Sequence, residues 1–169
     1  MASAYKVLGV DTSLRSSGVG VVQAQGNVLR AIEYSCIRNP ASRPHSGCLR
    51  TLHAELNALI ERTQPDAVAI EGVFYCKNVR TAVTLGQARG AVIAACALAG
   101  LPIFEYSPRK VKQALSGSGA GSKQQVSRMV QQILSLNETP QEDAGDALAI
   151  AICHLHHRTS VAALAPTPL

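Results

Sequence analysis

The chain has 169 residues and a mass of 17.8 kDa, a size typical of one domain. Hydrophobic residues make up 47% and charged residues 16%, a composition that excludes intrinsic disorder because it provides a sizeable core. Sixteen lysines and arginines against eleven aspartates and glutamates give a net charge of +5, which suits a polyanionic partner.

Hydrophobic periodicity divides the chain into strands and helices. Nearly continuous apolar runs such as YKVLGV are typical of strands buried on both faces, whereas apolar residues three and four apart indicate helices. The pair Gly26-Asn27 is a hairpin-turn signal within a three-stranded meander. In chain order we expect strands at residues 5–10, 18–23 and 28–37, a helix at 48–62, a strand at 67–73, a helix at 80–99, a strand at 103–106, and helices at 123–136 and 141–157.

The connecting segments are recognised by their composition. Residues 40–47 are rich in Ser, Pro and Gly, and Pro108 begins a short basic segment. Residues 116–122 (SGSGAGS) have the lowest complexity and predict a mobile loop. Strands first and crossover helices later predict one mixed α/β domain over residues 1–158, followed by a disordered tail over residues 159–169.

Several protein classes are excluded. The most apolar stretch, residues 91–104, is shorter than a membrane span, and Asp11 interrupts the apolar run that a signal peptide would need. The five cysteines show no C-x-x-C spacing, so a disulfide framework or a structural zinc site is not expected. We therefore expect a soluble intracellular protein that does not contact a membrane.

Four carboxylates stand next to apolar segments. Asp11 ends the first strand, and Glu71 lies within the apolar strand AVAIEGV. Asp143 and Asp146 are three residues apart, so they share one face of the last helix beside its apolar stripe. Buried carboxylates that converge repel one another unless cations neutralise them, and oxygen ligands favour Mg²⁺ or Mn²⁺.

Each acid also has a purely structural interpretation. Asp11 could cap a turn, and Asp143 could complement the dipole of the last helix. Glu71 is harder to explain in this way, because it lies between apolar residues in a strand. Taken together in the order strand, strand, helix, the acids favour a metal site.

Five segments, in this order, resemble the bacterial RuvC Holliday-junction resolvases of the ribonuclease H-like nuclease superfamily: GVD, AIEGVF, LGQARG, FEYSPRKVKQ and DAGDALAIAI. The resemblance covers residues 7–157. It implies a ribonuclease H-like α/β fold, a five-stranded mixed sheet with helices on both faces. It also implies a homodimer with the helix at residues 80–99 in its interface, four-way junction DNA as substrate, and action in the bacterial cytoplasm at the nucleoid. The RuvA–RuvB branch-migration complex is a further partner that the family suggests.

The resemblance also assigns roles to individual residues. It implies that the four acids are the catalytic ligands of two Mg²⁺ ions, which Mn²⁺ can replace, and that paired symmetric nicks result from two-metal hydrolysis. Two lysines match those that the family places near the scissile phosphate, with Lys123 catalytic and Lys112 on the DNA. Phe74 matches an aromatic that family members press against junction bases. Basic neighbours of these residues extend the predicted DNA-binding set: Lys77, Arg80, Arg109 and Lys110.

Three other functions remain open at this point. A ribonuclease H-like enzyme that cuts RNA–DNA hybrids would have the same acids, and a non-catalytic junction-binding protein would have the same fold. GVDTSLRSSGVGVV also resembles the phosphate-binding hairpin of actin-like kinases, which need two lobes. Thr12 and Ser13 follow Asp11 where many RuvC proteins have Pro-Gly, a difference that concerns substrate preference more than activity.

Overall fold

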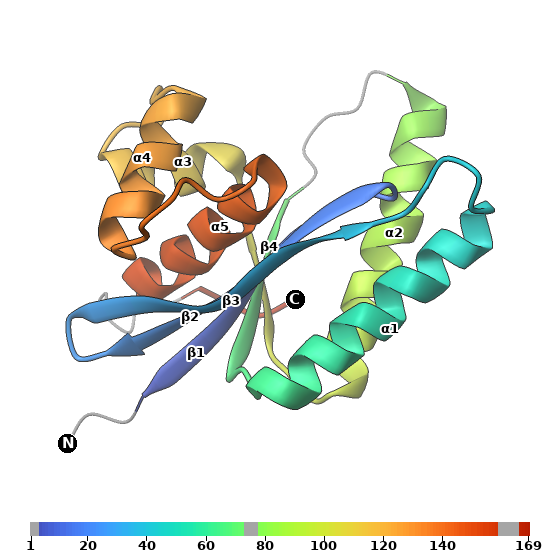
Figure 1. Cartoon of the computed structure of the whole chain (residues 1–169), viewed down its shortest axis with the longest axis horizontal. Helices are drawn as coiled ribbons and strands as arrows, with labels where there is room; N and C mark the ends of the chain where they lie inside the picture. The colour runs from blue at the N-terminus through green and yellow to red at the C-terminus, as the bar shows by residue number, and fades with distance from the viewer. Residues whose placement is uncertain (1–3, 73–77, 159–165) are drawn as a thin grey trace.

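A mixed sheet of five strands lies at the centre of the computed structural model, which describes residues 4–72, 78–158 and 166–169 (Figure 1). Helices cover the sheet on both sides. The elements in chain order are β1 (Tyr5–Asp11), β2 (Ser16–Gln25), β3 (Val28–Arg38), α1 (His45–Thr63), β4 (Ala67–Glu71), α2 (Val79–Leu98), β5 (Ile103–Tyr106), α3 (Pro108–Ser116), α4 (Lys123–Ile133) and α5 (Glu142–Arg158).

The strand order is β3-β2-β1-β4-β5. The meander β1-β2-β3 is antiparallel, whereas β4 and β5 run parallel to β1. The predicted mixed five-stranded sheet is therefore confirmed. Because β1 and β4 are parallel neighbours, their carboxyl ends meet at the same edge of the sheet.

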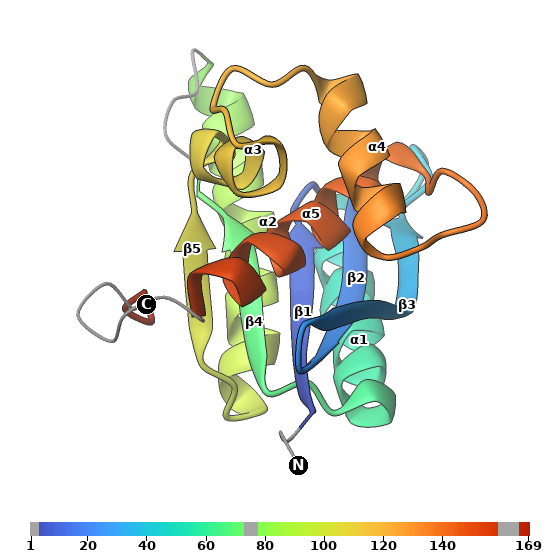
Figure 2. The same cartoon turned by 90° about the vertical axis from the view of Figure 1, so that its left-hand side faces the viewer.

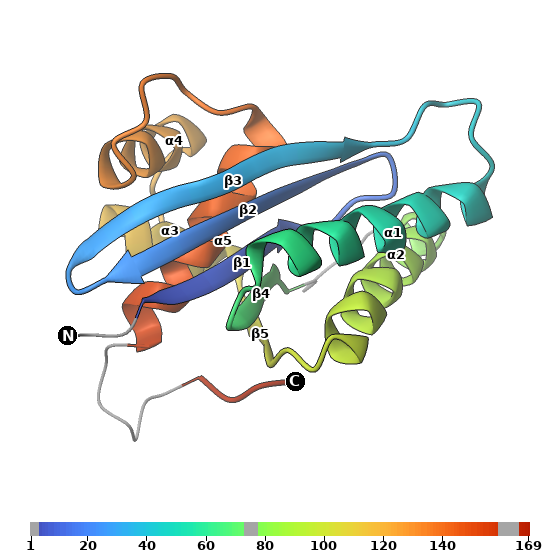
Figure 3. The ribbon, with the colours of Figure 1, turned by 60° about the horizontal axis from the view of Figure 1, so that its bottom comes forward.

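Two helical layers enclose the sheet (Figure 2). Helices α1 and α2 lie side by side on one face (Figure 3), and α3, α4 and α5 cover the other. Helix α5 approaches the strands so closely that side chains would not fit between them. A Cβ atom at Gly9 would lie 1.9 Å from the Ala147 carbonyl oxygen, and one at Gly18 would lie 1.7 Å from that of Asp143. This contact fixes the start of α5 against β1 and β2.

Some elements differ from the sequence prediction. The basic segment that begins at Pro108 is a helix, α3, because Ser107 caps its first turn and Val111 and Leu115 are buried one helical turn apart. Helix α4 ends at residue 133 rather than 136, and Ser135 follows in a left-handed conformation. Strand β4 ends at residue 71 instead of 73.

The C-terminal segment is described only in part. Residues 159–165, where most of the disordered tail was predicted, lie outside the described residues. Beyond them, the backbone N–H of Leu169 donates to the carbonyl of Ile103 at 2.8 Å, so the last residue lies beside β5.

Helix α2 is long and apolar enough to cross a membrane by length and composition, with a mean hydropathy of 1.3. In the sequence, residues 91–104 were the best candidate for a membrane span because they form the most apolar stretch, although residues 80–99 were predicted to form a helix. Helix α2 packs against α1, and Ala88, Val92 and Ala95 belong to the core between them and the sheet. Some of its apolar side chains are exposed, including Val79 and Val83.

Candidate active site

A cavity of about 270 Å³ lies where the carboxyl ends of β1 and β4 meet α3, α4 and α5. Apolar side chains of the helices form part of its wall. Its charged lining consists of three acids and two lysines: Asp11, Glu71, Asp146, Lys112 and Lys123. The cavity thus brings together residues that are up to 135 positions apart in the sequence.

The two strand acids are placed by the register of the sheet. Asp11 and Glu71 are the last residues of β1 and β4, and the preceding residues Val10 and Ile70 are paired in the parallel ladder. Side chains alternate between the faces of a strand. Val10 and Ile70 point into the core on the α1–α2 side, so Asp11 and Glu71 point toward α5. The two carboxylates are therefore neighbours on one face.

The two helix acids occupy different surroundings. Asp146 lines the cavity, whereas Asp143, one turn earlier, is not part of its wall. The hydroxyl of Ser16, the first residue of β2, donates a hydrogen bond to Asp143 Oδ2. Asp143 nevertheless lies close enough to contribute to the electrostatic environment of Asp11. The structure thus places three predicted ligands in one cavity and the fourth at its margin.

Burial and mutual repulsion shift the three acids that line the cavity toward their protonated forms. Burial, followed by the charges of Asp146, Glu71 and Asp143, raises the pKa of Asp11 to about 7, and Lys123 opposes this shift. Burial also raises the pKa values of Glu71 and Asp146, with Asp146 adding to the effect on Glu71. Such a cluster binds a proton or another cation more readily than a single exposed carboxylate does.

Two lysines contribute positive charge to the cavity. The Lys123 ammonium forms ion pairs with Glu142 and with Asp146, the latter at 3.2 Å, and these contacts raise the lysine pKa. Lys112 on α3 is close enough to counter the rise in the pKa of Glu71. The cavity therefore combines anionic ligands with cations that can face a phosphate group.

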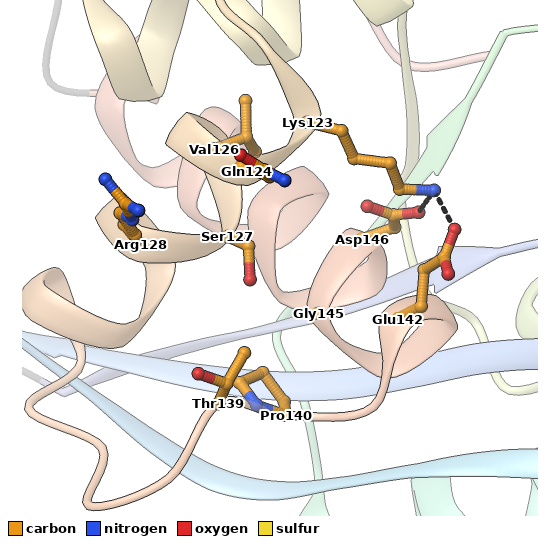
Figure 4. A pocket seen from close by; sticks show the side chains of 10 residues that line it. All are labelled: Lys123, Gln124, Val126, Ser127, Arg128, Thr139, Pro140, Glu142, Gly145 and Asp146. Carbon is orange, nitrogen blue, oxygen red and sulfur yellow. Dashed lines mark hydrogen bonds and ion pairs between the residues drawn. The ribbon is translucent and has the colours of Figure 1, made fainter.

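A second cavity of about 450 Å³ adjoins the first between α4 and the start of α5 (Figure 4). Lys123 and Asp146 line both cavities, and Lys123 reaches across the figure toward Asp146 and Glu142. Ser127 and Arg128 of α4 provide further polar groups along the wall. The second cavity thus extends the first one away from Asp11 and Glu71.

The donor set fits hard divalent cations. Asp11, Glu71 and Asp146 offer only oxygen ligands, which Mg²⁺ and Mn²⁺ prefer over softer donors. Within the described ranges, no three acidic, histidine or cysteine side chains already surround one point as metal ligands. The ammonium of Lys123 lies beside Asp146 instead. Side-chain rotations are therefore required for the acids to converge on an ion.

The other predicted DNA-binding residues have different positions. Phe74 and Lys77 lie outside the described residues, so their predicted roles have no structural counterpart here. Arg80 is exposed in the first turn of α2. Arg109 and Lys110 are exposed in the first turn of α3, next to the lysine that lines the cavity.

Three residues near the acids had no assigned role in the sequence analysis. Ser16 contacts Asp143, Glu142 contacts Lys123, and Arg89 contacts the backbone of Glu71. A serine at a strand start and an acid in the first turn of a helix are too common to indicate a site by themselves. Arg89 lies within the LGQARG segment, which was singled out as a motif without a role for its arginine.

Residues 7–154 match the sequence model of the family described as Crossover junction endodeoxyribonuclease RuvC. A curated relative of that name from Pelotomaculum thermopropionicum is 46% identical over 154 residues, which is 90% of this chain and 94% of the relative. One from Alkalilimnicola ehrlichii is 47% identical over 151 residues, covering 89% and 91%. The solved structure described as T. thermophilus RuvC in complex with Holliday junction substrate has a TM-score of 0.91 at 33% identity, over 98% of this chain and 99% of that one.

Proposed function

This chain belongs to the RuvC family of crossover junction endodeoxyribonucleases, and from that premise we propose that it resolves four-way DNA junctions by hydrolysing one phosphodiester bond in each of two opposing strands. The observation that carries the proposal is the cavity in which Asp11, Glu71 and Asp146 lie with two lysines. The same fold in a RuvC bound to a Holliday junction substrate supports four-way DNA as the substrate.

In this proposal the acids hold two divalent metal ions, with Mg²⁺ as the ion used and Mn²⁺ as a substitute. When bound, such ions activate water, neutralise the phosphate and stabilise the leaving oxygen. Asp11, whose pKa is raised by burial and by the charges of the three other acids, would help to hold both ions. Glu71 would help to hold one ion, and Asp143 and Asp146 would help to hold the other.

The lysines act on the substrate. Lys123 places its ammonium beside Asp146, where it can face the negative charge that develops on the phosphoryl oxygens. Lys112 belongs to α3, whose first turn also contains the exposed residues Arg109 and Lys110. We expect this basic surface and Arg80 to bind the strands that leave the junction. Phe74 and Lys77, which lie outside the described residues, are proposed to contact the DNA as well.

We infer that the active form is a homodimer whose interface includes α2. The exposed face of this helix contains Val79 and Val83. At Gly86 and Gly90, one turn apart, an added Cβ would meet nothing within 4 Å, so these glycines leave open space on the exposed side. Small residues on the exposed side of a helix allow a second helix to approach closely. Two active sites in one dimer explain how opposing strands receive paired nicks.

The remaining expectations concern the cellular setting. A nuclease for recombining chromosomes acts in the cytoplasm at the nucleoid, and a branch-migration complex such as RuvA–RuvB is a suitable partner because it moves the junction. Two alternative functions, a nuclease for RNA–DNA hybrids and a non-catalytic junction-binding protein, make different predictions. A hybrid-cutting enzyme would require RNA, and a non-catalytic binding protein would have no use for the acidic cavity.

A cleavage assay with three end-labelled substrates tests the proposal. A mobile four-way DNA junction, a linear duplex of matching sequence and an RNA–DNA hybrid are each incubated with Mg²⁺ and wild-type protein or Asp11→Asn. We expect symmetric nicks in the junction alone, and none with the variant. Cleavage of the hybrid would instead indicate a ribonuclease H-like enzyme that cuts RNA–DNA hybrids. Junction binding without cleavage in either Mg²⁺ or Mn²⁺ would indicate a non-catalytic junction-binding protein.

A further inference from the structure

Arg89 of α2 connects two strands at the edge of the acidic cavity. Its Nη1 donates a hydrogen bond to the backbone carbonyl of Glu71 at 2.6 Å, and its Nη2 forms an ion pair with the Glu105 carboxylate on β5. The side chain of Arg89 is only 15% exposed, and that of Glu105 is 29% exposed. A guanidinium in this position is held on both sides by acceptors that water reaches poorly.

The carbonyl that Arg89 contacts lies at the point where β4 ends. The ladder between β1 and β4 stops at the pair Val10 and Ile70, one residue before Glu71. On the other side, the Gly72 N–H donates to the Tyr106 carbonyl of β5 at 2.8 Å. The peptide between Glu71 and Gly72 is therefore fixed by two hydrogen bonds, one that it donates to β5 and one that it accepts from Arg89.

We propose that Arg89 is a positioning residue for Glu71, so that the guanidinium, through the backbone of the strand end, holds the Glu71 carboxylate where it binds metal. This inference rests on the proposed function, because it assumes that Glu71 is a metal ligand. Groups that orient metal ligands typically contribute roughly 10- to 100-fold to metal affinity or activity. Arg89 thereby gives the LGQARG segment a role in the site.

The contact requires an arginine. Its two terminal nitrogens diverge in one plane and reach Glu71 and Glu105 at the same time. A lysine at residue 89 would preserve the charge but would have a single ammonium on a flexible stem, so it could not bridge the two acceptors in a fixed geometry. Arg89→Lys is therefore the substitution that separates positioning from charge.

The test measures Mn²⁺ binding to the metal-free protein by electron paramagnetic resonance, without DNA. We expect Arg89→Lys to weaken Mn²⁺ binding by about 10-fold, because the backbone of Glu71 loses a fixed partner. Glu71→Gln serves as the reference for loss of the ligand itself. Arg62→Lys is the matched control, since Arg62 forms an equivalent ion pair with Glu33 on the surface, and it should bind Mn²⁺ as wild type does.

The same series separates the two claims. Weak binding by Glu71→Gln together with wild-type binding by Arg89→Lys would overturn the role of Arg89 and leave the proposed function intact. Wild-type binding by Glu71→Gln would overturn both. If Arg89→Lys fails to fold, Glu105→Gln provides a second test. This variant retains an acceptor but removes the charge that anchors Arg89, so we expect it also to weaken Mn²⁺ binding. Unchanged binding by this second variant would then overturn the inference.

Discussion

The ammonium of Lys123 lies 3.2 Å from Asp146 Oδ2, and both residues line the acidic cavity as well as the second cavity beside it. This pair joins the first residue of α4 to the first turns of α5. The lysine thus places a positive charge directly beside one of the acids of the cavity.

Replacement of Lys123 by alanine should slow junction cleavage by roughly 10²-fold, since one group that stabilises developing negative charge is removed. Binding of the junction should weaken far less, because many other basic groups contact the phosphates. Single-turnover cleavage and electrophoretic binding measure the two effects. Arg50→Ala, at an exposed position of α1 on the opposite side of the sheet, is the control. An equal loss in binding and in cleavage would contradict a role in the chemical step.

The raised pKa of Asp11, about 7 against an ordinary value of 3.8, predicts a pH-dependent stability of the metal-free protein. Between these values the folded state binds more protons than the unfolded state, so the contribution of Asp11 to stability falls as the pH rises. Asp11→Asn removes this contribution. We therefore expect the free energy of unfolding of Asp11→Asn, measured relative to that of the wild type, to rise by ~2 kcal/mol from pH 5 to pH 8.

Urea denaturation in EDTA, for wild type and Asp11→Asn, measures this difference. The comparison also cancels the opposite effect of His154, whose pKa burial lowers to about 4 and which destabilises the fold as the pH falls. Added Mg²⁺ should stabilise the wild type at pH 8 and the variant much less. A constant difference between the two proteins across this pH range would show that the pKa of Asp11 is not raised in the folded state.

Ser16→Ala should weaken metal binding by about 10-fold, because Asp143 would lose the hydroxyl that orients its carboxylate. The close contact of Gly18 with the Asp143 backbone remains, so the fold should be retained. Isothermal titration with Mn²⁺ measures the affinity, and Ser16→Thr, which retains a hydroxyl, should restore most of it. If Ser16→Ala binds Mn²⁺ as tightly as wild type, the orientation of Asp143 does not depend on this contact.

Gly90→Arg should produce a stable monomer if the exposed face of α2 is the dimer interface. The substitution places a long charged side chain in open space, so the folded monomer should not be strained. Sedimentation velocity measures the mass of the particle, and thermal unfolding monitors the fold. A dimer that persists with this variant would assign the interface to another surface.

Much of the fold was predictable from the sequence because apolar periodicity is strong in the buried strands and in α5. The four acids were recognised by their contrast with those apolar segments. Helix α3 was missed because basic residues dominate its first turn, and its burial depends on only two apolar side chains, Val111 and Leu115. The small residues of α2 divide between two roles: Ala88 and Ala95 pack inside the monomer, whereas Gly86 and Gly90 face outward.

Other features depend on tertiary contacts that a sequence pattern does not contain. The bond from Ser16 to Asp143 spans 127 residues, and Arg89 reaches a backbone carbonyl that could belong to any residue. The separation of Asp143 from the cavity wall depends on where α5 begins relative to β2, which the glycine contacts determine. These relationships became visible only in the folded arrangement.

Crystals soaked in Mn²⁺ and measured at the manganese absorption edge would show whether this cavity binds two metal ions. We expect two anomalous peaks in the cavity, both within coordination distance of Asp11, one shared with Glu71 and the other with Asp146. The ammonium of Lys123 should have moved away from Asp146. A cavity without manganese at saturating concentration, or peaks at residues other than these acids, would contradict the assignment of this cavity as the two-metal active site.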